Sequence, residues 1–245
     1  MYLREKTVVV IDVLRASTTV TAALYNGAKE IIPVATVESA MKIVGNLYGD
    51  VRLLGGERNG KMIEGFNLGN SPLEYTEERV FGKAIVYSTT NGSLAMVKAR
   101  YAKVMVVASF VNLSAVAAFV EDVTGSRNEE ESDIIILCAG RNGFYSLEDS
   151  VCAGMLIEKL SARKPALTSE CGDAGIVSLT MFKRHSRSLL KMLKNSEHGK
   201  YLSAIGYGDD LKFCAAVDSL PVVPQLLGNV VKLKKDGDSS KGSFS

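Results

Sequence analysis

The sequence predicts an α/β protein with a three-layer αβα architecture, in which the central sheet is mostly parallel or mixed. Short β-branched apolar runs alternate along the chain with longer segments of helical period, as in other α/β proteins. The runs are almost continuously apolar, as expected of strands that helices cover on both faces. With 245 residues, 47% of them apolar, the chain is long enough to bury a core without disulfides or structural metals.

The apolar runs and the periodic segments define the expected elements in order. Six strands are expected, at residues 8–11, 30–34, 51–54, 84–87, 103–107 and 133–137. Six helices are expected between and after them, at about 18–26, 36–47, 91–101, 112–122, 147–162 and 172–194. The polar segment 122–132 is expected to be a surface loop, and the Ser- and Gly-rich segment 234–245 a flexible tail. Because no repeat or Pro/Gly linker divides the rest, residues 1–233 are expected to form one domain.

Charge and cysteine content favour a soluble protein that binds small molecules. The 29 basic and 27 acidic residues are interspersed, so neither a nucleic-acid-binding surface nor a polybasic membrane patch is expected. No apolar run approaches the ~20 residues of a transmembrane helix, and the first residues lack the pattern of a signal peptide. The four cysteines form no CxxC motif, which indicates reduced thiols and a cytoplasmic location. Composition leaves self-association as a homo-oligomer open.

The segment after the first predicted strand combines an acid, a base and hydroxyl groups. Ligands of α/β proteins bind outside the carboxyl ends of the strands, and Asp12, Arg15, Ser17 and Thr18 follow such an end. A carboxylate here can hold Mg²⁺ or attack phosphorus, and Arg15 can bind phosphate oxygens. Ser17 or Thr18 can cap a helix whose N–H groups favour an anion. The alternative is structural: a buried Asp12–Arg15 pair beside an ordinary serine cap.

Glycines surround two charged residues after the third predicted strand. They let the backbone turn tightly and approach a ligand, while Glu57 and Arg58 offer charges of both signs. A plain glycine turn is the alternative. The Gly- and Asn-rich segment 64–72 is a long loop of a kind that is often functional.

A cluster of hydrogen-bond donors follows the fourth predicted strand. It consists of Ser88, Thr89, Thr90, Asn91 and Gly92, which lead into the next predicted helix. Hydroxyls and free N–H groups at a helix start are expected to bind an anion. Because the Gly-Lys-Ser/Thr of a P-loop is absent, ATP is not the expected ligand.

The sixth predicted strand is followed by Arg141 and Asn142, and then by Glu148 and Asp149 at a helix start. Arg141 offers another anion-binding guanidinium, whereas Glu148 and Asp149 either bind a cation or complement the helix dipole. If the sheet is parallel, all these strand ends meet at one edge. The sequence then predicts a site for a polyanion together with a metal ion.

Several phosphatase classes are excluded by missing motifs. The two histidines, His185 and His198, are too few for histidine-nucleophile or dinuclear metallophosphatases, and we interpret each as a surface or capping residue. Cys138 lacks the arginine of a cysteine-phosphatase loop, and Asp12 lacks the second aspartate of a D-x-D motif. A dinucleotide-binding G-x-G-x-x-G does not follow the first strand.

Blocks of sequence in consistent order resemble the 2-phosphosulfolactate phosphatase (ComB-type) family. They are VVVIDVLRASTTVTAAL, LLGGERNG, EGFNLGNSPLEY, STTNGS, ASFVNLSAV, CAGRNGFYSLEDSVCAG, SEHGKYL and VDSLPVVPQ, within about residues 7–225. Ser88 and Ser93 stand where threonine is expected, which keeps the hydroxyl group. The resemblance implies an αβα fold and a Mg²⁺-dependent hydrolase. Such an enzyme converts (R)-2-phospho-3-sulfolactate and water to (R)-3-sulfolactate and phosphate, a step of coenzyme M biosynthesis.

The resemblance also suggests roles for the residues at the strand ends. Asp12, Arg15 and Glu57 are expected to be catalytic, and Mg²⁺ to be bound by Asp12 and Glu57, with Glu148 or Asp149 as further ligands. The attacking group is either a Mg²⁺-polarised water or Asp12 itself.

Contacts to the substrate are expected from the hydroxyl, amide and guanidinium groups. These are Ser17, Thr18, Arg58, Ser88, Thr89, Thr90, Asn91, Gly92, Arg141 and Asn142. Arg58 and Arg141 would bind the sulfonate and the carboxylate. Two alternatives stay open: a phosphatase of another small phosphomonoester, and a non-enzymatic anion-binding module.

Overall fold

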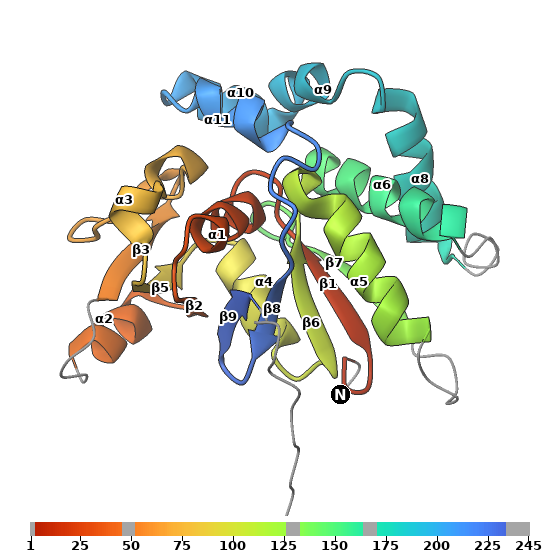
Figure 1. The fold of residues 1–245 in the computed structure, drawn as a ribbon. Coiled ribbons are helices and arrows are strands. Elements are labelled where there is room, and N and C mark those ends of the chain that lie inside the picture. The colour runs from red at the N-terminus through yellow and green to blue at the C-terminus, as the bar shows by residue number, and fades with distance from the viewer. Residues whose placement is uncertain (1–2, 46–51, 126–132, 164–170, 234–245) are drawn as a thin grey trace, which may run out of the picture.

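The computed structural model describes residues 3–45, 52–125, 133–163 and 171–233, and the described chain forms a nine-stranded sheet with helices on both faces (Figure 1). The strands are β1 (Thr7–Ile11), β2 (Glu30–Pro33), β3 (Arg52–Arg58), β4 (Lys61–Met62), β5 (Ala84–Ser88), β6 (Val104–Ala108), β7 (Ile134–Cys138), β8 (Pro224–Leu227) and β9 (Val230–Leu233). Their order across the sheet is β4-β3-β5-β2-β9-β8-β6-β1-β7.

Ten α-helices and two short 3₁₀ helices are described. The α-helices are α1 (Ala16–Tyr25), α2 (Val37–Gly45), α3 (Glu77–Val80), α4 (Gly92–Ala99), α5 (Leu113–Gly125), α6 (Leu147–Arg163), α8 (Asp173–His185), α9 (Leu189–Asn195), α10 (Glu197–Ala204) and α11 (Gly208–Cys214). The 3₁₀ helices are η1 (Pro72–Glu74) and η2 (Phe110–Asn112). No helix in the described ranges has the length and apolar character needed to cross a membrane.

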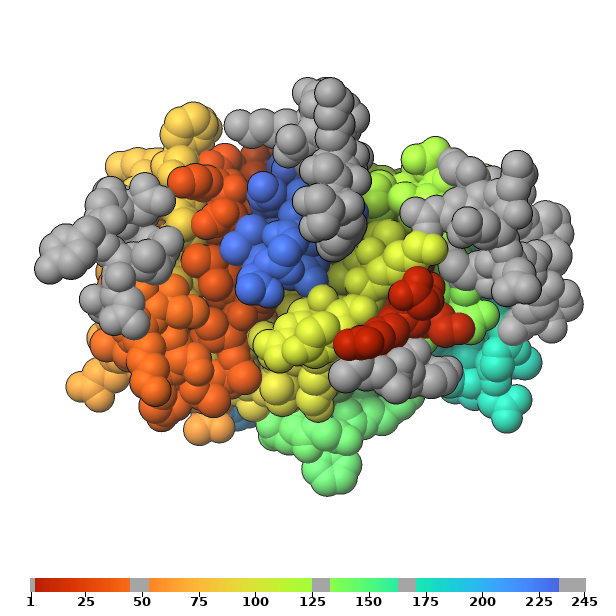
Figure 2. All heavy atoms as spheres, turned by 90° about the horizontal axis from the view of Figure 1, so that it is seen from below, coloured from red at the N-terminus to blue at the C-terminus, as the bar shows by residue number. Residues whose placement is uncertain are grey.

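The sheet is mixed. Strands β3, β5 and β2 are parallel to one another, and so are β6, β1 and β7. The antiparallel hairpin β8–β9 lies between these two groups, with Ile31 opposite Val231 and Val106 opposite Gln225. The blue hairpin is visible between the orange and yellow-green segments in Figure 2. The α/β class and the mixed sheet are therefore confirmed, a mostly parallel sheet is not confirmed, and the three-layer description stays a prediction.

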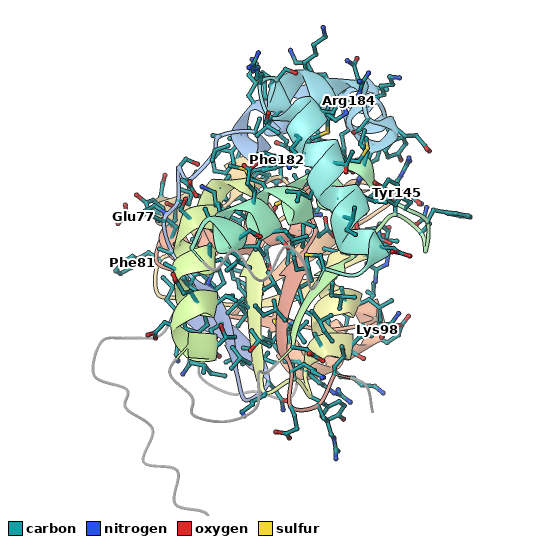
Figure 3. The ribbon with its side chains drawn as sticks, turned by 90° about the vertical axis from the view of Figure 1, so that its right-hand side faces the viewer. Glu77, Phe81, Lys98, Tyr145, Phe182 and Arg184 are labelled. Carbon is teal, nitrogen blue, oxygen red and sulfur yellow. The ribbon has the colours of Figure 1, made fainter. Side chains whose placement is uncertain are left out.

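The core lies on both faces of the sheet. Alternate residues of a strand point to opposite faces, and in β1 Val9 and Ile11 pack in a cluster with residues of α5, α6 and α8. Val8 and Val10 pack in a second cluster with α1 and α4. Phe182 of α8 lies against α6 in the first cluster (Figure 3). Because both faces of β1 are buried, its run of five residues is apolar without alternation except at Thr7.

The predicted elements are present with small shifts at their ends, with one correction. Residues 172–194 form two helices, α8 and α9, rather than one. The break coincides with Ser186 and Ser188, and Ser188 is the N-cap residue of α9; serine favours such positions over helix interiors. The predicted loop 122–132 is shortened by α5, which continues to Gly125. Residues 126–132 and the predicted tail 234–245 lie outside the described residues, and the single domain over 1–233 stays a prediction.

The C-terminal helices α9, α10 and α11 lie across the top of the molecule, above α1 (Figure 1). Helix α11 contacts η1 and η2, and α10 packs on α9 and α11. These helices bring late residues of the chain to the carboxyl end of β1, where the candidate site is.

Candidate active site

Asp12 is held by the turn between β1 and α1. Its Oδ1 atom accepts a hydrogen bond from the Ala16 N–H (3.2 Å), and its own N–H donates to the Ser17 Oγ (2.9 Å). Thr18 Oγ1 donates to the Val13 carbonyl (2.8 Å). Ser17 and Thr18 are fully buried, so their side chains stabilise this turn.

The pKa of Asp12 is raised from 3.8 to about 6. The largest cause is burial, which disfavours the charged form; the carboxylates of Glu57 and Glu148 raise the pKa further. The charge of His198 and the hydrogen bond from Ala16 act in the opposite direction. Asp12, Glu57 and Glu148 therefore concentrate negative charge in one buried place.

Glu57 joins the ends of two strands. Its Oε1 accepts a hydrogen bond from the Thr90 N–H, and its Oε2 accepts one from the Gly60 N–H, both at 2.8 Å. Glu57 as a whole is 7% exposed. The end of β3 is thereby fixed to the segment that connects β5 with α4.

Helix α4 begins directly against Asp12. A Cβ atom added to Gly92 would lie 2.4 Å from the Ala16 Cβ and 2.5 Å from the Asp12 Oδ2. Only glycine leaves room for this approach. The first turn of α4, with its free backbone N–H groups, therefore lies beside the Asp12 carboxylate.

A cavity of about 260 Å³ opens between these elements. Asp12, Arg15, Glu57 and Thr90 line it, together with Leu14, Asn59, Gly60, Asn70, Asn91, Arg141, Asn142, His198 and Tyr201. The Thr90 Oγ1 is a buried hydroxyl without a hydrogen-bond partner in the described structure. Buried polar atoms are normally satisfied, so this hydroxyl points to a ligand.

Arg15 is an almost completely buried cation in the wall of this cavity. Its Nη1 donates to the Asp210 Oδ2 (2.7 Å), and its Nη2 donates to the Gly60 carbonyl (2.6 Å). The guanidinium lies over the Tyr207 ring, 4.2 Å from the ring centre. Ser71 Oγ donates to the other oxygen of Asp210 (2.6 Å). Arg15 therefore pairs with Asp210 of α11, and not with Asp12 as in the structural alternative considered above.

Arg58 and two residues of the predicted donor cluster, Ser88 and Thr89, have partners of their own. Arg58 Nη2 donates to the Ser88 Oγ (3.0 Å), and its Nη1 donates to the Glu57 carbonyl (2.7 Å). Thr89 Oγ1 accepts from the Ser93 N–H (2.9 Å), and Ser93 Oγ accepts from the Thr89 N–H (2.8 Å). Of the described arginines, Arg15 and Arg141 line the cavity, whereas Arg58 belongs to this packing beside it.

Asn142 and Arg141 reach the cavity from the end of β7. The Asn142 N–H donates to the Asn91 Oδ1 (2.9 Å), which fixes this turn to the start of α4. Arg141 Nη1 donates to the Glu197 Oε1 (2.7 Å). Asn91, Arg141 and Asn142, all predicted from the sequence, are thus brought together with Thr90.

Glu148 and Asp149 have different environments, although they are adjacent in sequence. Asp149 accepts hydrogen bonds from the Val13 N–H (2.9 Å) and the Gly140 N–H (3.1 Å), and so fixes the ends of β1 and β7. Its pKa is raised by burial and by the charges of Asp12 and Glu148. Glu148 Oε1 lies 3.4 Å from the His198 Nδ1. Burial raises the pKa of Glu148, but hydrogen bonds and the charge of His198 outweigh burial, and the net shift is downward.

Six residues that line the cavity were not predicted as site residues, and neither was Asp210, which holds Arg15. The six are Leu14, Asn59, Gly60, Asn70, His198 and Tyr201. We interpreted His198 as a surface or capping residue, yet it lines the cavity. The block SEHGKYL contains both His198 and Tyr201 and was the available signal, although neither residue follows a predicted strand. Asp210 lies on the short helix α11, which no sequence pattern predicted.

The carboxylates of the cavity suit a metal ion that takes few ligands from the protein. Among the described residues, no group of three or more His, Cys, Asp or Glu side chains is arranged to hold a metal ion. Mg²⁺, however, is often bound by one or two carboxylates, with water and substrate phosphate completing its shell. Asp12 meets this need, because within the described chain no hydrogen bond reaches its Oδ2, and Glu57 lies in the same cavity wall. The negative charge around Asp12 fits a divalent cation.

Fold and site together define a class: an α/β protein whose strand ends hold buried carboxylates, an arginine and a helix start around one cavity, suited to an anion and a cation together. Comparison with known proteins gives the family. Residues 2–229 match the family model described as 2-phosphosulpholactate phosphatase, so the chain belongs to this family of phosphoric monoester hydrolases. The resemblance stated above is confirmed.

Relatives at similar length support the assignment. The chain is 41% identical over 234 residues to a protein of Caldanaerobacter subterraneus subsp. tengcongensis. The matched residues cover 96% of this chain and 93% of the relative. It is 39% identical over 230 residues to a protein of Thermotoga maritima, with 94% and 93% covered. For a protein of Clostridium perfringens the identity is 37% over 238 residues, with 96% and 92% covered. Each is named probable 2-phosphosulfolactate phosphatase.

Proposed function

We propose that the chain is a Mg²⁺-dependent phosphatase that converts (R)-2-phospho-3-sulfolactate and water to (R)-3-sulfolactate and phosphate. The family and the names of its relatives support the substrate. The observation that carries the chemistry is the buried Asp12 carboxylate beside the unpartnered Thr90 hydroxyl, in one cavity with Arg15. The product would enter coenzyme M biosynthesis, as the resemblance implies.

The phosphate group would lie between Thr90, Arg15 and the start of α4. Thr90 Oγ1 can donate a hydrogen bond to a phosphate oxygen, and the first N–H groups of α4 favour negative charge. Two of the Arg15 donors are used by Asp210 and Gly60, and this leaves further N–H groups for the ligand. This arrangement would hold the phosphate against Asp12.

Asp12 would hold Mg²⁺, with Glu57 as the second carboxylate. When bound, the ion neutralises phosphate oxygens and lowers the pKa of coordinated water. Glu57 keeps the end of β3 in register with Thr90 through its hydrogen bonds. Asp149 and Glu148 would act indirectly, because Asp149 supports the strand ends and Glu148 pairs with His198.

In the reaction, the bond between phosphorus and the ester oxygen breaks and a bond from water oxygen to phosphorus forms. The leaving oxygen gains a proton and becomes the hydroxyl of sulfolactate. Either water attacks directly, or Asp12 attacks first and water then hydrolyses the aspartyl phosphate. The stereochemical course at phosphorus, followed with a chiral thiophosphate ester in isotope-labelled water, separates the two routes, because one displacement inverts the configuration and two successive displacements retain it.

Phosphate release in the presence of Mg²⁺ tests the proposal. We expect the highest kcat/KM for 2-phospho-3-sulfolactate among a panel that includes phosphoglycerate, phospholactate and sugar phosphates. Preference for another member would assign a different phosphomonoester, and binding of sulfolactate without hydrolysis of any ester would identify an anion-binding module.

A cytoplasmic location is also proposed. Cys138, Cys152 and Cys214 form no disulfide in the described part of the chain, and burial raises the pKa of each of these thiols, as expected of inert thiols. Fractionation of host cells tests this location.

A further inference from the structure

We propose that Glu197 is an internal competitor for Arg141, which a ligand must displace before its second anionic group can bind this guanidinium, so that Glu197 limits the affinity for such ligands. The inference rests on the proposed function, because it concerns the part of the substrate that lies beyond the phosphate. It assigns Glu197 as a specificity-determining residue.

Arg141 lies at the place that a second anionic group of the ligand would reach, between two neighbouring cavities. A cavity of about 420 Å³ adjoins the one described above, and both are lined by Arg141, Asn142 and His198. Glu197 lines the second cavity together with the exposed Phe144. A small substrate whose phosphate lies beside Asp12 would therefore direct its remaining groups past the Arg141 guanidinium.

The position of Arg141 is fixed from two sides. The backbone N–H of Arg141 donates to the Phe144 carbonyl (3.0 Å) and closes a tight turn. In the same turn, the backbone N–H of Asn142 donates to the Asn91 Oδ1 (2.9 Å). The guanidinium lies over the Tyr201 ring, 5.1 Å from its centre. Tyr201 is itself held, because its hydroxyl donates to the Asn59 carbonyl (2.9 Å).

Glu197, in contrast, is held weakly. Its side chain is 92% exposed, whereas that of Arg141 is 25% exposed. An ion pair between exposed groups contributes little to stability, so a ligand can replace Glu197 at small cost. Arg15, the other arginine lining these cavities, has a buried partner in Asp210 and is not free in this way.

A sulfonate is well suited to the exchange. It presents several oxygens to the planar donor pair of a guanidinium, as a carboxylate does. A phosphate ester without a second anionic group would leave Arg141 with Glu197. Such an ester neither gains from Arg141 nor breaks the ion pair, so Glu197 sets how strongly the site prefers a ligand with a second anionic group, and its removal should increase that preference.

Binding of (R)-3-sulfolactate, measured by calorimetry with the full chain in Mg²⁺ buffer, tests the proposal. We expect Glu197→Gln to bind about two- to fivefold more tightly than the wild type, the range that an exposed ion pair can account for. Arg141→Met should bind at least tenfold more weakly. In the Arg141→Met background, Glu197→Gln should have no effect, because its partner is gone.

Asp209→Asn is the matched control, since it removes one negative charge from an exposed ion pair on the neighbouring helix α11. An equal gain in Asp209→Asn, or a gain from Glu197→Gln that persists without Arg141, would overturn the proposal, as would absence of binding to every variant. If the variants show the expected affinities for sulfolactate but the wild type releases no phosphate from any ester, the inference about Glu197 is supported and the proposed phosphatase activity is rejected.

Discussion

The surroundings of Asp12 disfavour the charged form of its carboxylate, because the group is buried and lies near the carboxylates of Glu57 and Glu148. Because the folded-state pKa, about 6, lies above the ordinary value of 3.8, the native protein binds the proton more tightly than the unfolded chain does. Stability from this group is therefore greatest at low pH and is lost as pH rises from about 4 to 6. A bound cation would offset this loss of stability, because it stabilises the ionised form of the buried Asp12 carboxylate.

We predict that Asp12→Asn abolishes phosphate release and stabilises the apoprotein. The neutral amide removes a buried charge, so the free energy of unfolding at pH 7 should rise by about 1–3 kcal/mol. The advantage should shrink as pH falls toward 4, where Asp12 is protonated in the wild type. Urea unfolding at several pH values measures it; full activity in the variant, or an advantage independent of pH, would contradict the assignment.

Mg²⁺ binding is predicted to depend on the same residue. Chelation should stop phosphate release, and added Mg²⁺ should restore it. Mg²⁺ should also raise the thermal midpoint of the wild type, because a ligand that binds the native state stabilises it. In Asp12→Asn this rise should be lost; an equal rise in both proteins would show that the ion binds elsewhere.

Among single residues, those that follow strands could be predicted. Asp12, Glu57, Thr90 and Arg141 all follow or end apolar runs, and the structure brings them to one cavity. His198 could not be found in this way, because it lies on a helix that follows another helix. Arg58 was predicted to bind the substrate, but its side chain donates to the Ser88 Oγ and does not line the cavity. The sequence shows where a charged residue lies along the chain but not which way its side chain points.

At the scale of elements, the start of α4 depends on Gly92. In Gly92→Ala the added methyl would collide with Ala16 and Asp12. We predict a loss of about 1–3 kcal/mol in stability and about 100-fold in kcat/KM, measured by unfolding and phosphate release. Gly172→Ala is the control, because nothing lies within 4 Å of its added Cβ; a similar loss there would show that the effect is not local.

Helix α11 is predicted to hold Arg15 in place. In Asp210→Asn the buried guanidinium loses its charged partner, so stability should fall by about 3 kcal/mol and phosphate release should decrease. Asp209→Asn changes the preceding, 80% exposed carboxylate and should shift stability by less than about 0.5 kcal/mol. Equal effects of the two substitutions, measured by urea unfolding, would argue against a special role for Asp210.

The long elements were predictable, whereas several of the short ones were not. Helix α6 spans 17 residues with a clear period, whereas β8 and β9 have four residues each and α11 has seven. In such short segments the pattern is too brief to distinguish strand, helix and loop. Their conformation follows from tertiary contacts, as with β8 and β9, which pair with each other and with β6 and β2.

For the whole molecule, the convergence of strand ends has a different cause from the one expected. The antiparallel hairpin reverses strand direction between β2 and β6, so in a flat sheet the carboxyl ends of the two parallel groups would lie at opposite edges. Sheets twist by about 20–25° per neighbouring strand. Five such steps separate β5 from β1, so a twist of this size would turn the two groups of strand ends by about 100–125° relative to each other, which is consistent with Asp12 and Glu57 lining one cavity. The prediction that Asp12 and Glu57 lie close together assumed a parallel sheet. The two residues do line one cavity, but the sheet that carries them is mixed.

The central claim is that phosphate and Mg²⁺ bind together in the cavity lined by Asp12, Glu57 and Thr90. A crystal structure with Mg²⁺, orthovanadate and (R)-3-sulfolactate tests it most directly. We predict that the Asp12 carboxylate contacts the metal ion and the Thr90 hydroxyl contacts vanadate. Vanadate bound outside this cavity, for example beside Arg58 and Ser88, would contradict the account.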